Sequence, residues 1–139
     1  MGADAMENII AVVLPYWQRQ AAAIAGLQSV AYWNVNTRME LIVVDDGDPV
    51  PFVADGIDHA VRIVRLPEKS GAKSACVPIN RGVEAALGEV IVLSCPEMLH
   101  VMPTFPAMLR ALVLGGANAY VSASVWAPES NVWHVHGTR

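Results

Sequence analysis

Five short apolar segments, each bounded by turn-forming residues, constrain the fold of this chain more than any other feature of its sequence. Such blocks are typical of strands that are buried on both faces of a sheet. The segments cover residues 9–14 (IIAVVL), 40–44 (ELIVV), 61–66 (VRIVRL), 90–93 (VIVL) and 119–125 (AYVSASV). Helices are predicted between them, at residues 20–31, 79–87 and 105–114. This alternation predicts a single α/β domain of three layers, with a mostly parallel central sheet flanked by helices.

Polar or aromatic residues directly follow three of the predicted strands. These loops are Pro15-Tyr16-Trp17, Asp45-Asp46-Gly47-Asp48 and Ser94-Cys95-Pro96-Glu97. In open parallel sheets, ligands bind beyond the carboxyl ends of the strands. We therefore expect the three loops to lie at one edge of the sheet and to form one ligand site.

The first two loops carry groups that can recognise a nucleotide. Asp45 and Asp46 can accept hydrogen bonds from the N–H groups of a nucleobase, although Asp-Gly at a strand end is also ordinary turn chemistry. Tyr16 and Trp17 can stack on a base, a contact worth about 1–3 kcal/mol in single-strand nucleic-acid binders. They can equally cover the top of the core. Both interpretations stay open at this stage.

Cationic residues gather in and after a glycine-bearing loop at residues 68–75. Lys69, Lys73 and Arg81 can neutralise the charge of a diphosphate, or they can belong to a solvated charged loop. Neither a GxGxxG nor a GxxxxGK[ST] motif occurs, so the dinucleotide fingerprint and the Walker loop are not supported.

The loop after the fourth strand is a candidate metal site. Glu97 can ligate Mg²⁺ or Mn²⁺, which often use one or two carboxylates together with substrate phosphates. Cys95 is a soft ligand and suits these ions poorly. His100 lies close by in the sequence and is predicted to be a surface histidine.

Composition excludes some classes of function. The formal net charge is −4 and no basic run occurs, which argues against a nucleic-acid binder. The chain is 54% hydrophobic and 16% charged, so we expect a partner to cover part of its surface and predict a homodimer. Cys76 and Cys95 fit neither a metal cluster nor a disulfide framework and are predicted to be buried free thiols.

The same composition bears on location. Residues 1–8 lack the lysines of a signal peptide, and the longest apolar run is too short to span a bilayer. We therefore expect a cytoplasmic protein without a transmembrane segment.

These segments, in their order and spacing, resemble family 2 glycosyltransferases. VVLPYWQR (residues 12–19) is similar to the first strand and its P-[TY]-[YW]-N-R-like loop, and ELIVVDDGD (40–48) is similar to the E-[IL]-I-V-V-D-D-G-S motif. Residues 62–93 resemble the third strand, the loop with N-x-G, the second helix and the fourth strand. The resemblance covers residues 9–125. It implies a Rossmann-like GT-A domain that binds a nucleotide-diphosphate sugar for inverting transfer to an acceptor hydroxyl.

The resemblance also assigns roles by position. It places the Pro15-Tyr16-Trp17 loop around base and ribose, Asp46 on the base, and Lys69 or Lys73 near the base or the phosphates. Arg81 matches the Asn-Arg pair that opens the second helix.

Two departures from the family pattern affect the functional assignment. The D-x-D metal motif is replaced by Cys95-Pro96-Glu97, so only Glu97 keeps an acidic position. The family's acceptor half and its general base lie beyond the matched region, and neither Glu129 nor His134 sits where that base is expected. We therefore predict a truncated or partial catalytic domain covering residues 1–139.

Two other functions compete with this one. The first is a non-catalytic nucleotide-sugar-binding module with a degenerate metal site, which the thiol at position 95 and the missing base favour. The second is a nucleotidyltransferase, but those enzymes usually open with a glycine-rich basic loop that Pro15-Tyr16-Trp17 does not resemble.

Overall fold

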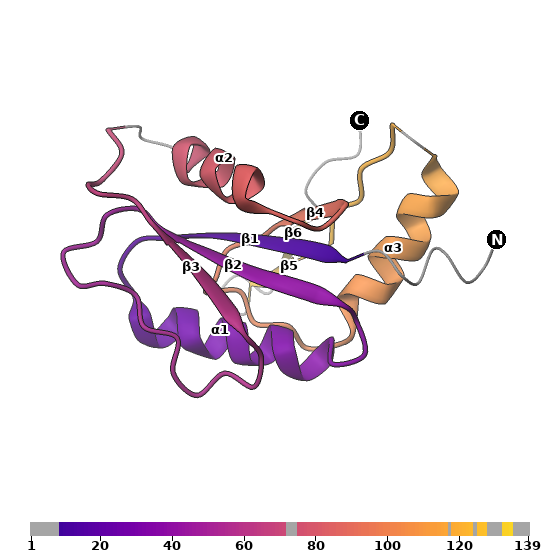
Figure 1. The fold of residues 1–139 in the computed structure, drawn as a ribbon. Coiled ribbons are helices and arrows are strands. Elements are labelled where there is room, and N and C mark those ends of the chain that lie inside the picture. Colours follow the sequence, from indigo (N-terminus) through magenta and orange to yellow (C-terminus); the bar gives the residue numbers. More distant parts are fainter. Residues whose placement is uncertain (1–8, 72–74, 117, 124, 128–131, 135–139) are drawn as a thin grey trace.

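A four-stranded, all-parallel sheet forms the centre of the molecule (Figure 1). The computed structural model describes residues 9–71, 75–116, 118–123, 125–127 and 132–134. The strands of this sheet are β1 (Ile10–Tyr16), β2 (Met39–Asp45), β3 (Val61–Arg65) and β4 (Val90–Leu93). Their order is β3-β2-β1-β4, and each pairs in parallel with its neighbour. The predicted α/β class and parallel sheet are confirmed, and the arrangement is compatible with a Rossmann-like fold.

Helices cover both faces of the sheet and complete three layers (Figure 1). One face packs against α1 (Gln20–Trp33) and α3 (Thr104–Gly115), and the other packs against α2 (Cys76–Ala85). Successive residues of a strand point to opposite faces. In β1, Val12 therefore packs in the larger core with α1, whereas Val13 packs in the smaller one under α2. Both side chains are fully buried, which explains why the strands have continuous apolar sequences.

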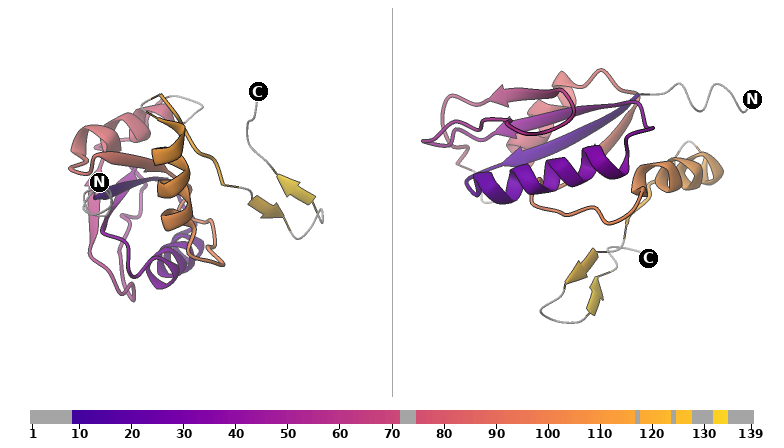
Figure 2. Two further views of the ribbon diagram at one scale, coloured as in Figure 1. Left: turned by 90° about the vertical axis from the view of Figure 1, so that its right-hand side faces the viewer. Right: turned by 90° about the horizontal axis from the view of Figure 1, so that it is seen from below.

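The prediction of a fifth strand at residues 119–125 is wrong. Residues 119–123 form no strand, and β5 (Val125–Ala127) pairs antiparallel with β6 (Val132–His134) instead. This hairpin extends away from the rest of the molecule (Figure 2). The physical reason lies in composition, because the alanines and serines of AYVSASV offer little apolar area to bury against β4.

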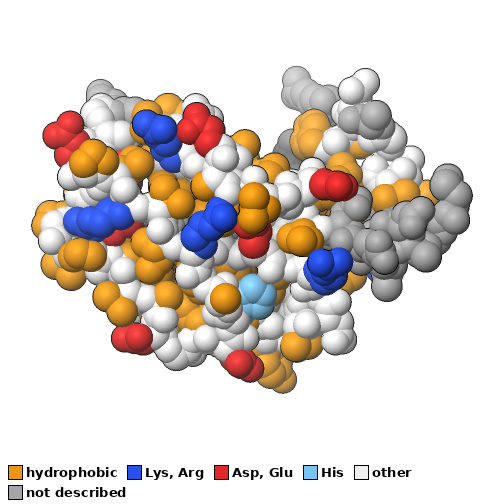
Figure 3. Space-filling view, viewed as in Figure 1, with side chains coloured by type: hydrophobic (Ala, Val, Ile, Leu, Met, Phe, Trp, Pro, Cys, Tyr) orange, Lys and Arg blue, Asp and Glu red, His pale blue; other side chains and the backbone are white. Residues whose placement is uncertain are grey.

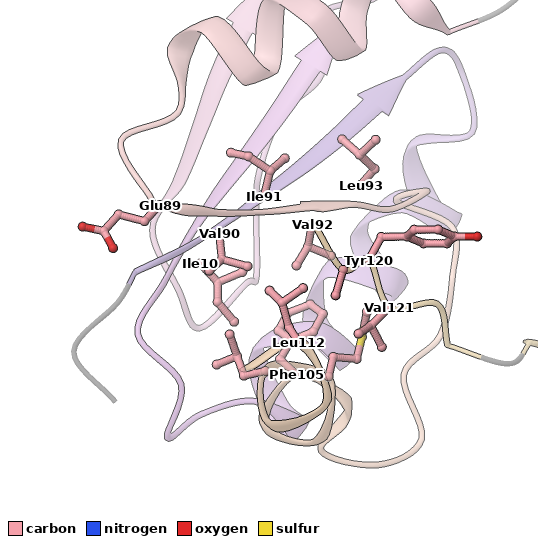
Figure 4. Close-up of a pocket in the computed structure, with 13 residues that line it drawn as sticks. Ile10, Glu89, Val90, Ile91, Val92, Leu93, Phe105, Leu112, Tyr120 and Val121 are labelled. Carbon is pink, nitrogen blue, oxygen red and sulfur yellow. The ribbon is translucent and has the colours of Figure 1, made fainter. Parts of the chain in front are cut away.

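The edge of β4 borders a cavity of about 450 Å³ between this strand and α3 (Figure 4). Its lining is mainly aliphatic and aromatic, with side chains such as Ile91 and Leu112 labelled in the figure. Large apolar side chains also reach solvent nearby, with Leu93 57% and Leu114 88% exposed. Figure 3 shows hydrophobic side chains spread over the visible face, interspersed with charged groups of both signs. Among the described residues, no helix is both long and apolar enough to cross a bilayer.

Both cysteines are exposed, which corrects the prediction that they are buried. Cys76 is the first residue of α2, and Cys95 lies where the chain leaves the sheet after β4. Neither position is inside an apolar layer, so the general tendency of free cysteines to be buried does not apply here.

Candidate functional site

The loops after β1, β2 and β4 meet at the carboxyl edge of the sheet. Strands β1 and β2 end side by side, since Tyr16 pairs with Asp45 and the Asp46 N–H donates to the Tyr16 carbonyl oxygen at 3.0 Å. Strand β4 pairs with the other edge of β1. The chain order therefore reverses between β1 and β4, which is the position where ligands bind in doubly wound sheets.

Asp45 is fully buried, and its carboxylate holds the following loop. Its Oδ1 accepts the Asp48 N–H at 2.9 Å, and its Oδ2 accepts the Phe52 N–H at 2.9 Å. The same Oδ2 forms an ion pair with the Arg65 guanidinium at 2.6 Å. These contacts satisfy two buried backbone donors, so Asp45 fixes the conformation of residues 48–52.

Asp46 faces a different loop, at residues 69–70. Its Oδ1 accepts the Ser70 N–H at 3.0 Å, and its Oδ2 accepts the Ser70 hydroxyl at 3.0 Å and the Lys69 ammonium at 2.5 Å. Burial alone raises the pKa of this carboxyl group, but the hydrogen bonds from Lys69 and Ser70 outweigh it and the pKa is lowered overall. Asp46 is therefore ionised at neutral pH although it is only 3% exposed.

Lys69 joins the first two loops. Its Nζ lies 4.6 Å from the centre of a Trp17 ring, a cation–π contact, while it pairs with Asp46. Gly47 makes this approach possible, because it has φ +73° and a Cβ there would lie 2.2 Å from the Glu68 carbonyl carbon. The predicted residues Trp17, Asp46 and Lys69 are thus brought together.

The loop after β1 has a strained backbone. Gln18 and Arg19 both have positive φ values, 58° and 59°, which non-glycine residues rarely adopt. Asp48 stabilises this conformation, since its Oδ2 accepts the Gln18 N–H at 2.6 Å. Strain of this kind, worth about 1–3 kcal/mol per residue, often occurs in loops that present a ligand-binding side chain. Here the side chain that immediately precedes it is Trp17.

The sequence left open whether Tyr16 and Trp17 stack on a base or cover the core, and the structure distinguishes the two residues. Tyr16 is buried and packs its ring at 4.8 Å from that of Phe52, so it belongs to the core. Burial raises the pKa of its hydroxyl, and the charges of Asp48, Asp45 and Glu97 raise it further. Trp17 is only half-buried, and the Lys69 ammonium lies over its ring.

Glu97 belongs to the loop after β4, which is fixed against α1. Gly26 of α1 touches this loop so closely that a Cβ would lie 1.7 Å from the Pro96 carbonyl oxygen. Partial desolvation raises the pKa of the Cys95 thiol, and the charge of Glu97 raises it further. The charge of Glu97 also contributes to the raised pKa of Tyr16.

As a candidate metal site, this loop offers one hard oxygen ligand and a protonated thiol. Within the described part of the chain, no three acidic, histidine or cysteine side chains gather around one point. The donor set at Cys95 and Glu97 does not by itself suit Mg²⁺ or Mn²⁺.

His100 secures the far end of the same loop and is not the surface residue that was predicted. Its backbone N–H donates to the Ser29 hydroxyl at 2.8 Å. Its ring packs edge-on against the Phe105 ring, with the two ring centres 5.2 Å apart. Its Nδ1 lies 3.4 Å from the amide nitrogen of the buried Asn34. That amide is oriented by the Phe105 N–H, which its oxygen accepts at 3.1 Å. His100 therefore faces a donor, which favours its neutral form, and burial lowers its pKa.

The remaining predicted cations are not brought into this cluster. Lys73 lies outside the described residues. Arg81 is exposed on α2 and pairs with Glu84, one helical turn along, at 3.3 Å. Pro15 is half-buried within β1, opposite Val44 of β2, and is a structural neighbour of the loop.

Sequence reasoning did not select Ser70 or Arg65. Ser70 contributes two of the three donors to Asp46, and Arg65 binds both the Asp45 carboxylate and the Asp48 carbonyl oxygen at 2.6 Å. The position of Ser70 next to Lys69 in the sequence is the signal that could have identified it. For Arg65 the signal was its register, since β3 pairs it with Asp45.

Comparison of the sequence with protein-family models and with curated proteins gives no match.

Proposed function

We propose that this chain is the donor-side domain of a GT-A-type glycosyltransferase and binds a nucleotide-diphosphate sugar. One observation carries the proposal: Trp17, Asp46 and Lys69 meet at the carboxyl edge of a parallel sheet. An aromatic face, a buried carboxylate and a partly exposed cation are three groups that can bind a base and a diphosphate. The resemblance of residues 9–125 to family 2 glycosyltransferases supports the same function.

In this proposal the base stacks on Trp17, and one of its N–H groups donates to Asp46. The diphosphate extends toward the loop after β4, where the chain order reverses between β1 and β4. Glu97 would hold a divalent cation only with the help of phosphate oxygens. Sugar transfer then needs a base that deprotonates the acceptor hydroxyl, and the resemblance places that base beyond the matched region.

The test is a binding assay on an aspartate pair. Calorimetry with UDP, GDP, CDP and dTDP should give saturable binding to at least one of them by the parent protein. Asp46→Ala should abolish that binding, whereas Asp55→Ala, an exposed aspartate of the loop before β3, should leave it unchanged. Equal affinity of the parent and the Asp46 variant would refute the assignment.

A specific observation keeps a second candidate function, a non-catalytic nucleotide-sugar-binding module. The position of the first metal-motif acid holds Cys95, whose thiol stays protonated at neutral pH because its pKa is raised. A donor-consumption assay with a panel of acceptor sugars tests the second candidate. Acceptor-dependent turnover excludes the module and supports the enzyme, whereas binding without turnover is expected both of the module and of a donor-side domain without its general base.

A further inference from the structure

The carboxylate of Asp46 is already saturated on one side. A carboxylate oxygen offers about two lone-pair sites, and Oδ2 uses both, for the Lys69 ammonium and the Ser70 hydroxyl. Oδ1 accepts the Ser70 N–H, and the whole residue is 3% exposed. Oδ1 keeps one lone-pair site, but because the residue is so little exposed, the direct way for a ligand N–H to reach the carboxylate is to replace one of these donors.

Lys69 is the donor that can leave. Its side chain is 44% exposed, so its ammonium can return to water, and it sits at the end of a flexible four-carbon stem. Ser70 is held more firmly, since its backbone N–H and its hydroxyl both bind Asp46. Displacing Ser70 would require movement of the backbone next to Gly47, which packs against residues 68 and 69.

The Lys69 ammonium also occupies the second surface that a base needs. It lies 4.6 Å from the Trp17 ring centre and 2.5 Å from the Asp46 carboxylate at the same time. A planar base that stacks on Trp17 and donates to Asp46 would fill the space of this ammonium. Base and ammonium therefore compete for one pair of partners.

We infer that Lys69 is a latch that the nucleobase opens, so that its ammonium is released from Asp46 and Trp17 to bind the diphosphate of the same ligand. This inference rests on the proposed function. The latch links recognition of the base to recognition of the diphosphate. Binding of the base costs the free energy of the Lys69 contacts, and the new contact between the ammonium and the phosphates offsets that cost. A nucleoside opens the latch without supplying the anion that the freed ammonium then binds.

This linkage has a signature that a purely structural lysine lacks, because its effect has opposite signs for two ligands. Lys69→Met keeps the apolar stem over Trp17 and removes the ammonium. We expect the variant to bind uridine or guanosine about two- to fivefold more tightly, since a half-exposed ion pair no longer competes. We expect it to bind UDP or GDP about tenfold more weakly, since a charge-assisted contact to phosphate is lost.

The experiment is calorimetry of the whole chain with uridine, UDP, guanosine and GDP. Arg110→Met is the matched control, because it removes one exposed cation from α3, away from the three loops of the site, and should change each affinity less than twofold. Unfolding in urea checks that each variant is folded. Tighter nucleoside binding combined with weaker diphosphate binding by Lys69→Met supports the latch.

Other outcomes overturn it. If both ligands weaken together, Lys69 only supports the site, and if both tighten, it does not bind phosphate; either result refutes the latch and leaves the proposed function standing. If both affinities stay unchanged, Lys69 takes no part in binding, and the latch is again refuted. If the parent binds none of these compounds and neither CDP nor dTDP, the proposed function fails and the latch fails with it.

Discussion

Asp45 and Asp46 are adjacent and chemically identical, yet their removal should have very different effects on stability. Asp45→Ala leaves the buried N–H groups of Asp48 and Phe52 without an acceptor. Each orphaned buried donor costs about 1–3 kcal/mol, so we expect a loss of about 2–6 kcal/mol in the free energy of unfolding. Arg65 adds little, because its side chain is 38% exposed and water replaces the lost contact.

Asp46→Ala should cost only about 1 kcal/mol by the same reasoning. Its donors come from the half-exposed Lys69 and from Ser70, which lies near the surface, so both can bind water instead. A domain of this size has about 5–15 kcal/mol of stability in total. Asp45→Ala should therefore threaten folding, whereas Asp46→Ala should not.

Urea unfolding monitored by circular dichroism measures both losses. Asp45→Asn serves as a second variant, because it keeps the side-chain volume and removes a cavity as the explanation. It should still destabilise clearly, since it retains one carbonyl oxygen where the carboxylate used two. Equal losses for Asp45→Ala and Asp46→Ala, with equal m-values, would refute the division of roles.

Three further predictions concern pH, metal and association. Burial lowers the pKa of His100 below its ordinary value of 6.5, so on acidification the unfolded chain takes up the proton first. The free energy of unfolding should therefore fall as the pH drops below about 6.5. His100→Gln should flatten this dependence on pH, and an unchanged slope would contradict the prediction. Cys95→Asp should strengthen Mn²⁺ binding in calorimetry with UDP present, by adding a second hard ligand beside Glu97, and no gain would count against the metal site. The exposed Leu93 and Leu114 should promote a homodimer, which light scattering would disprove by showing a monomer at high concentration.

Strands β1 and β2 were predictable because their burial is encoded in continuous apolar runs, whereas the edge strands β3 and β4 are half-buried or exposed. Residues 90–93 were predicted and observed as a strand with the same bounds, and residues 40–44 were extended by one residue at each end. Helix α2 begins three residues earlier than predicted, at Cys76, and contains Pro78 in its first turn. Proline is tolerated there because the N–H groups of a first turn have no helical partner.

The sequence was enough to predict which residues belong to the site, but not which of them contact one another. Sequence order and the carboxyl-edge rule were enough to nominate Trp17, Asp46 and Lys69. The contact of Lys69 with Asp46 depends on the path of a loop, which no local pattern specifies. The different roles of Asp45 and Asp46 depend on which side of the sheet edge each side chain faces, and two neighbouring aspartates give the sequence no means to distinguish them.

The order of residues in Asp45-Asp46-Gly47-Asp48 explains how one short turn serves both the scaffold and the ligand. Strand alternation sends the first carboxylate toward residues 48–52 and the second toward residues 69–70. The glycine without a Cβ then allows the backbone next to Lys69 to come close, and the last aspartate fixes the strained loop that follows Trp17. Asp46 and Gly47 therefore position the loop that carries Lys69, whereas Asp48, which Asp45 holds, positions the loop that carries Trp17. A ligand site assembled like this should lose affinity after changes to residues that never touch the ligand.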